Sequence, residues 1–120
     1  MRFLLKIAKF RNFWYSKNVK TDRRAHQIEP ITVNGKKVIQ VIIDAHYEKN
    51  HRAYMSDDLI LALVRELDGR LEVPDEKSGR FSYFATLIEK SGKMYRLVWL
   101  LEDDAIYIGV VNAYRDRRRS

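Results

Sequence analysis

Residues 80–115, RFSYFATLIEKSGKMYRLVWLLEDDAIYIGVVNAYR, decide the fold of this chain. Runs of Val, Ile, Leu, Tyr, Phe and Trp are separated by the short polar segments 91–93 and 102–104, and no proline interrupts them. β-branched and aromatic residues favour strands, and short polar breaks favour turns. The stretch therefore predicts a meander of three antiparallel strands.

A second strand pair is predicted upstream, over residues 31–43. Asn34-Gly35 supplies the two positive-φ positions of a two-residue hairpin turn. Residues 38–43 are nearly all β-branched, which predicts a central or well-covered strand. The strand before the turn follows Pro30, so we expect it to be a short edge strand. Residues 16–29 are polar without a period and are expected to form a linker.

A helix is predicted between the hairpin and the meander. Ser56 is a good N-cap, Asp57 and Asp58 suit the positive end of the helix dipole, and Gly69 is a typical stop signal. We therefore expect an α+β fold with an antiparallel sheet: a β-hairpin, a central helix on one face, and the three-stranded meander. The loop at 71–79 has room for a short edge strand before Pro74. The other face must be covered by the N-terminal segment, a partner or a ligand.

Charge and length suggest two parts. The chain has 120 residues and a net charge of +7, and residues 1–25 hold eight Lys or Arg against one acid. We expect residues 1–25 to be a basic amphipathic segment and residues 26–120 to be a single α+β domain. The absence of cysteine excludes a disulfide framework and a cysteine nucleophile, and it fits a cytoplasmic protein.

The N-terminal segment has a helical apolar stripe, made of Phe3, Ile7, Phe10 and Trp14. A further helix is therefore an option here. It could dock on the domain, bind an anionic surface, or become ordered only with a partner. Its uncharged run is too short to span a bilayer, so membrane contact through residues 1–20 is not favoured.

Functional residue types gather in residues 44–55, where the candidates are His46, Lys49, His51 and Arg52. In a helix or a strand the two histidines point in different directions, unless the backbone bends between them. Their spacing does not match the usual zinc pair, so neither a metal nor a cofactor is predicted. Solvated or capping roles are the alternative.

A second set of candidates closes the chain. If the last strand alternates regularly, Val110, Asn112 and Tyr114 share one face and Arg115 lies on the other. Arg96 interrupts an apolar face of the middle strand and needs an acid, a phosphate or solvent. The terminal arginines are Arg117, Arg118 and Arg119. A solvated basic tail is the alternative for this end.

From residue 49 to 118 the chain resembles small bacterial toxins of the RelE and BrnT type, within the barnase–EndoU–colicin–RelE ribonuclease fold. The resemblance rests on the order of KNH (49–51), the helix MSDDLILALVREL (55–67), the strands FSYFATLIEK (81–90) and KMYRLVWLLED (93–103), and the basic ending IYIGVVNAYRDRRR (106–119).

The resemblance implies a metal-independent endoribonuclease toxin, usually held inactive by an antitoxin. A base would activate the 2′-OH of RNA for attack on the adjacent phosphate, an acid would protonate the leaving oxygen, and cations would stabilise the charge. The expected roles are base or acid for His46 or His51, phosphate clamps for Arg96 and Arg115, and positioning for Asn112 and Tyr114. Basic contacts to RNA are expected from Lys49, Arg52, Arg117, Arg118 and Arg119.

The competing hypothesis is a non-catalytic module that binds nucleic acid or an acidic protein through its basic ends. The expected partners are therefore RNA and a cognate antitoxin protein, with a homodimer as a further option.

Overall fold

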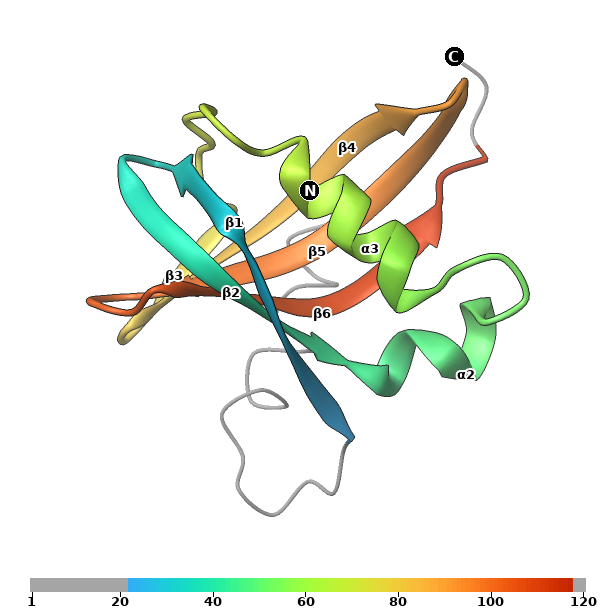
Figure 1. Cartoon of the computed structure of the whole chain (residues 1–120), viewed down its shortest axis with the longest axis horizontal. Helices are drawn as coiled ribbons and strands as arrows, with labels where there is room; N and C mark the ends of the chain where they lie inside the picture. The colour runs from blue at the N-terminus through green and yellow to red at the C-terminus, as the bar shows by residue number, and fades with distance from the viewer. Residues whose placement is uncertain (1–21, 118–120) are drawn as a thin grey trace.

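The computed structural model describes residues 22–117, which form an α+β fold built on one six-stranded sheet (Figure 1). The strands lie in the order β1-β2-β6-β5-β4-β3 across the sheet. The elements in chain order are β1 (Arg23–Val33), β2 (Lys36–Asp44), the 3₁₀ helix η1 (Ala45–Tyr47), α2 (Glu48–His51), α3 (Asp57–Arg65), β3 (Glu76–Ser78), β4 (Phe81–Lys90), β5 (Lys93–Glu102) and β6 (Tyr107–Arg115).

The predicted hairpin and meander are confirmed, but the sheet is mixed rather than fully antiparallel. β1 pairs with β2, and β4, β5 and β6 pair in succession, all antiparallel. β2 and β6 instead run parallel, with Val41 opposite Ile108. Because α3 crosses over between β2 and β4, these two strands point the same way. The chain then reverses direction from β4 to β5 and again from β5 to β6, so β6 runs parallel to β2. No local sequence pattern predicts this pairing between distant strands.

Strand β1 is much longer than predicted. It begins at Arg23, so residues 23–29 are not a linker, and the strand crosses the expected domain boundary between residues 25 and 26. The polar sequence misled the prediction because this is an edge strand, which needs less apolar patterning, and its register shifts between Gln27 and Ile31. The option of an N-terminal helix concerns residues outside those described.

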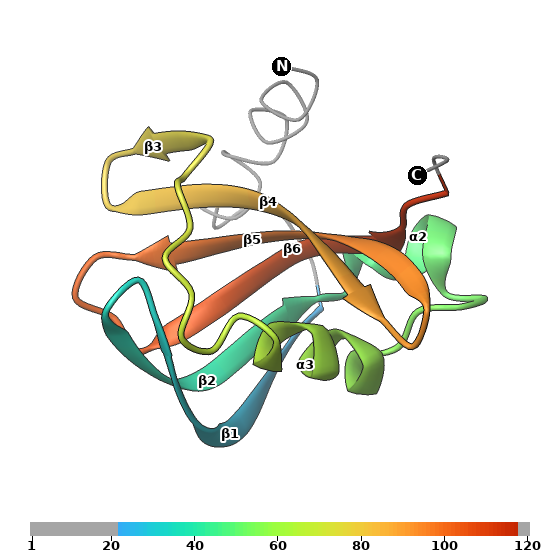
Figure 2. The ribbon, with the colours of Figure 1, turned by 90° about the horizontal axis from the view of Figure 1, so that it is seen from above.

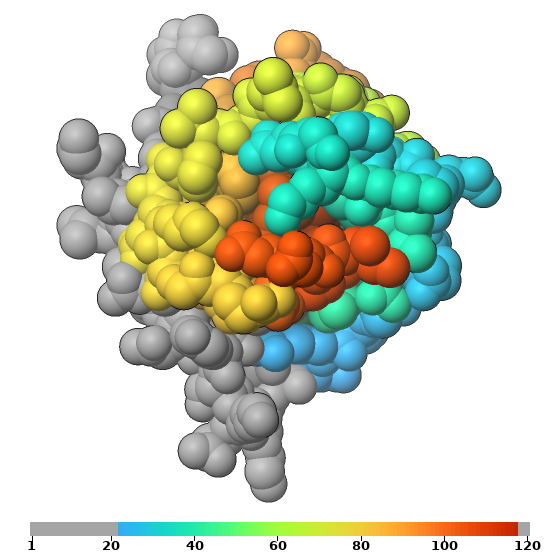
Figure 3. Space-filling model, turned by 90° about the vertical axis from the view of Figure 1, so that its left-hand side faces the viewer, coloured from blue at the N-terminus to red at the C-terminus, as the bar shows by residue number. Residues whose placement is uncertain are grey.

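The Asn-Gly hairpin turn is confirmed, with φ values of 54° at Asn34 and 74° at Gly35. The Asn34 backbone N–H donates to the Arg70 carbonyl at 2.9 Å, and its side-chain amide exchanges hydrogen bonds with the backbone of Glu72. Figure 3 shows this turn beside the loop that follows α3, with the turn between β5 and β6 next to them. The edge strand expected before Pro74 lies after it, as β3.

Helix α3 lies on one face of the sheet (Figure 2). Ser56 caps it by accepting the Leu59 backbone N–H at 3.1 Å. The core on this side includes Trp99, which stacks on Phe84 at 4.0 Å between ring centroids. A second, smaller apolar cluster lies on the opposite face and consists of Phe81, Tyr83, Val98, Leu100 and Val111, all buried.

A β-bulge in β6 changes which side chains share a face. Val98 lies opposite Asn112 but Trp99 lies opposite Val110, so Val111 is an extra residue. The expectation that Val110 and Tyr114 share a face is therefore wrong. Val110 belongs to the core under α3, whereas Tyr114 packs against the cluster on the opposite face.

Candidate functional site

The His51 imidazole lies in a cluster of aromatic side chains at the end of β6. Its Nδ1 atom is 2.8 Å from the Tyr54 hydroxyl, and its ring stacks on Tyr114 with centroids 5.4 Å apart and planes 27° from parallel. The Arg117 guanidinium lies over the Tyr54 ring, 5.5 Å from its centroid. We call His51, Tyr54, Tyr114 and Arg117 the His51 cluster. It joins α2 to the chain end, more than 60 residues away in the sequence.

Each part of this cluster has a local cause. A single turn of 3₁₀ helix, which holds His46, and a single turn of α-helix, which holds His51, follow β2 directly. The β6 bulge turns Tyr114 to the face opposite α3, where His51 meets it. Bulges often re-aim a side chain beside a functional site.

Arg96 anchors the chain just beyond β6. It lies opposite Tyr114 in the register, and its Nη2 atom donates to Asp116 Oδ2 at 3.0 Å. The two side chains are only 9% and 8% exposed. The Asp116 backbone N–H also donates to the Met94 carbonyl. This ion pair holds the residue before Arg117 and supports a positioning role for Arg96, whereas the prediction was a phosphate clamp.

The other predicted site residues of β6 are divided between the two faces. Asn112 lies opposite Val98 and so shares a face with Tyr114, and its side-chain oxygen accepts the Ala113 backbone N–H. Arg115 lies opposite Tyr95, whose side chain belongs to the core under α3. Since residues paired across strands project to the same face, the sheet separates Arg115 from Tyr114.

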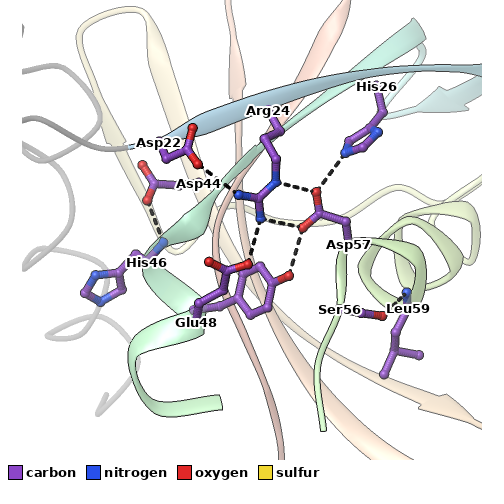
Figure 4. Close-up of polar contacts among 10 residues, drawn as sticks. Asp22, Arg24, His26, Asp44, His46, Glu48, Ser56, Asp57 and Leu59 are labelled. Carbon is purple, nitrogen blue, oxygen red and sulfur yellow. Dashed lines mark hydrogen bonds and ion pairs between the residues drawn. The ribbon is translucent and has the colours of Figure 1, made fainter. Parts of the chain in front are cut away.

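The remaining candidates lie outside the His51 cluster. His46 is in η1, where its backbone N–H donates to Asp44 Oδ1 at 2.8 Å, and its imidazole points away from Asp57 (Figure 4). Lys49 and Arg52 are exposed at and beside α2. Arg118 and Arg119 lie outside the described residues.

A second polar network surrounds Asp57, at the start of α3 (Figure 4). Its carboxylate accepts two hydrogen bonds from Arg24, both at 2.8 Å, one from Tyr47 at 2.8 Å, and it lies 2.9 Å from His26 Nε2. Arg24 also pairs with Glu48 at 3.2 Å. We call Arg24, His26, Tyr47 and Asp57 the Asp57 network; it ties β1 and η1 to α3.

The Asp57 network shifts the pKa values of its members. The hydrogen bonds from Arg24 hold the pKa of Asp57 far below its usual range, and the bond to Asp57 raises the pKa of Arg24. Burial, together with the bond to Asp57, raises the pKa of Tyr47 to about 12. Asp57 is thus held as a carboxylate and Tyr47 as a neutral phenol near pH 7. This network is a structural tie, and it fixes both ends of the segment that carries His51.

Sequence reasoning missed Tyr54 and the Asp57 network. The pattern assigned Asp57 only to the helix dipole, because its partner Arg24 lies 33 residues away in a segment predicted as a linker. Tyr54 had a usable signal, since it stands three residues after His51, where a helical turn brings side chains together.

The described part of the chain contains no group of three or more His, Cys, Asp or Glu side chains arranged to hold a metal ion. None of the helices within residues 22–117 has the length and apolar character needed to cross a bilayer. No family model, curated protein or solved structure matched the chain.

Proposed function

We propose that this protein is an endoribonuclease toxin that cleaves RNA without a metal ion, with His51 as its proton carrier. What supports the proposal is one observation: the His51 imidazole is held between the Tyr54 hydroxyl and the Tyr114 ring, with the Arg117 guanidinium beside them. Histidine exchanges protons near neutral pH, and arginine binds phosphate through paired N–H groups.

The Tyr54 hydroxyl gives His51 a defined role. When Nδ1 carries the proton and donates a hydrogen bond to the Tyr54 oxygen, the imidazole is in the tautomer whose basic atom is Nε2. It then takes the proton of a 2′-OH, whose oxygen attacks the adjacent phosphorus. The bond to the 5′-oxygen breaks, and the imidazolium returns the proton to this leaving oxygen. Arg117 stabilises the negative charge that develops on the phosphate.

The proposal includes RNA as substrate, a cognate inhibitory antitoxin protein and a cytoplasmic location. Tyr114 and Asn112 position the substrate beside His51, and the exposed Lys49 and Arg52 contact its backbone. Arg96 supports the site by fixing Asp116, and the terminal arginines add electrostatic attraction.

The test is cleavage of a single-stranded RNA oligonucleotide by the full chain in EDTA, with the same sequence in 2′-deoxy form as control. We expect fragments that end in a 2′,3′-cyclic phosphate and begin with a 5′-hydroxyl, and no cleavage of the deoxy oligonucleotide. Cleavage of the deoxy form would overturn the 2′-OH mechanism. RNA binding without any cleavage would favour the non-catalytic binding module instead.

A further inference from the structure

The outer edge of β4 is only partly covered within the described residues. β3 pairs with β4 over Phe81 to Tyr83 and no further. The Ala85 N–H then donates to the Asp75 carboxylate at 3.0 Å, whereas β4 continues to Lys90. Backbone groups alternate sides along a strand, so those of Leu87 and Glu89 face the same outer edge as those of Tyr83 and Ala85.

The two edges of the sheet differ in how they resist strand addition. β1, at the far edge, carries Pro30 and a register shift between Gln27 and Ile31, both of which discourage a further strand. The β4 segment 85–90 has neither proline nor bulge. Leu87 is 40% exposed, so at this position the edge has an apolar residue in place of the charge or distortion that discourages strand addition in natural sheets.

The charges beside the β4 edge are mainly acidic. Asp75 and Glu89 are exposed next to it, Lys90 is already paired with Glu66 at 3.2 Å, and the exposed Lys93 lies on the neighbouring strand β5, opposite Lys90. A nucleic acid would be repelled here, and a second copy would bring the same acids together. An extended peptide with an apolar residue opposite Leu87 and a basic residue opposite Glu89 would match both features.

We propose that residues 85–90 of β4 bind an extended, basic and apolar segment of a partner protein, which adds a strand to the sheet. Such binding uses the backbone groups of Leu87 and Glu89 for hydrogen bonds and their side chains for selectivity. It is independent of RNA cleavage, because the His51 cluster is not part of this edge.

The probe is a fluorescein-labelled peptide in which Thr-Val-Thr-Lys is repeated twice, with Thr-Val-Thr-Glu repeated twice as its control. Val and Lys then alternate on one face of the extended peptide. We expect saturable binding of the Lys peptide to the full chain by fluorescence anisotropy, at least tenfold tighter than the Glu peptide. The amides of Leu87 and Glu89 should become protected from hydrogen exchange.

Leu87→Pro removes an outward-facing N–H while leaving the bonds to β5 intact, and it should weaken the Lys peptide at least tenfold. Ala25→Pro is the matched control, since it makes the same change at the outer edge of β1 and should leave binding unchanged. Glu89→Lys, which keeps the backbone donor, should reverse the preference between the two peptides.

The proposal would be overturned if the Lys peptide showed no saturable binding, if wild type and Glu89→Lys bound the Lys peptide equally well, or if amide protection appeared in β1 and not in β4. Sedimentation that reveals a dimer lost on Leu87→Pro would assign the edge to a second copy and likewise reject the partner segment.

Discussion

Replacing Asp57 with asparagine tests whether the Asp57 network holds the fold around α2. The substitution keeps the shape of the side chain but removes its charge. Each carboxylate oxygen now serves two partners: Oδ2 lies near Arg24 Nε and His26, and Oδ1 accepts from Arg24 Nη2 and Tyr47. An NH₂ group in place of Oδ2 faces the Arg24 Nε–H, and one in place of Oδ1 faces the Arg24 Nη2–H. In either orientation at least one Arg24 donor therefore loses its acceptor.

The magnitude follows from burial and charge. Hydrogen bonds to a charged group contribute about 1.5–3 kcal/mol each at most, and breaking a fully buried ion pair costs about 3–5 kcal/mol. The Asp57 side chain is 16% exposed and Arg24 is 31% exposed, which weakens both effects. We therefore expect Asp57→Asn to lower the free energy of unfolding by about 2–4 kcal/mol, a large share of a typical total of about 5–15 kcal/mol.

The assay is urea unfolding at pH 7, with Asp58→Asn as the matched control. Asp58 is exposed in the same first turn of α3, so its loss removes mainly a dipole interaction, worth about 0.3–1 kcal/mol. With a slope of about 2 kcal/mol per molar urea, the Asp57 variant should unfold about 1–2 M earlier than wild type. Equal midpoints for the two variants would refute the reasoning.

The pH dependence provides an independent check on the same network. The folded state lowers the pKa of Asp57 below its unfolded value of about 4, so its contribution is complete above that pH. As the pH falls below about 4, the unfolded state takes up the proton first and this stabilisation is lost. The stability gap between wild type and Asp57→Asn should therefore shrink below pH 4, and a constant gap would contradict the assigned charge.

Three further substitutions probe single contacts, each measured by urea unfolding. Tyr47→Phe should lower the free energy of unfolding by about 1–2 kcal/mol at pH 8. Because the fold raises the pKa of Tyr47 from 10 to about 12, wild type should lose this advantage as the pH rises between those values. A difference in stability between wild type and Tyr47→Phe that widens above pH 10 would disprove the shift. Thr86→Val removes the hydroxyl oxygen that accepts the Trp99 indole N–H at 2.9 Å, which should lower the free energy of unfolding by about 1–3 kcal/mol. An unchanged unfolding midpoint would show that another acceptor replaces Thr86. Asn34→Gly keeps the positive φ of the turn but removes both side-chain bonds to Glu72, so a loss of about 1–2 kcal/mol is expected, and wild-type stability would argue that those bonds contribute nothing.

The parts of the fold that were predictable are those with local causes. Strand-forming runs, the Asn34 turn and the Ser56 cap each depend on a few adjacent residues, and all three are present. The length of β1 and the parallel pairing of β2 with β6 depend instead on contacts between distant segments. Arg24 looked like part of a basic linker because its partner, Asp57, is identified only once the chain is folded.

The candidate site was predictable in its residue types but not in its arrangement. His51 and Tyr114 were both singled out, and they do stack on each other. Regular alternation placed Tyr114 on the wrong face, because nothing in the sequence marks Val111 as a bulge. Arg115 lies on the other side of the sheet from Tyr114, as the alternation of neighbouring residues predicted. Arg96 was expected to need an acid, a phosphate or solvent, and its acid is Asp116.

The most direct test of the central claim is the single-turnover rate of RNA cleavage in EDTA by wild type, His51→Ala and His46→Ala. Removing a general base or acid lowers a rate by about 10²–10⁴-fold. We predict a loss of this size for His51→Ala and a rate within a few-fold of wild type for His46→Ala. No cleavage by the wild type, or equal rates for wild type and His51→Ala, would contradict the account.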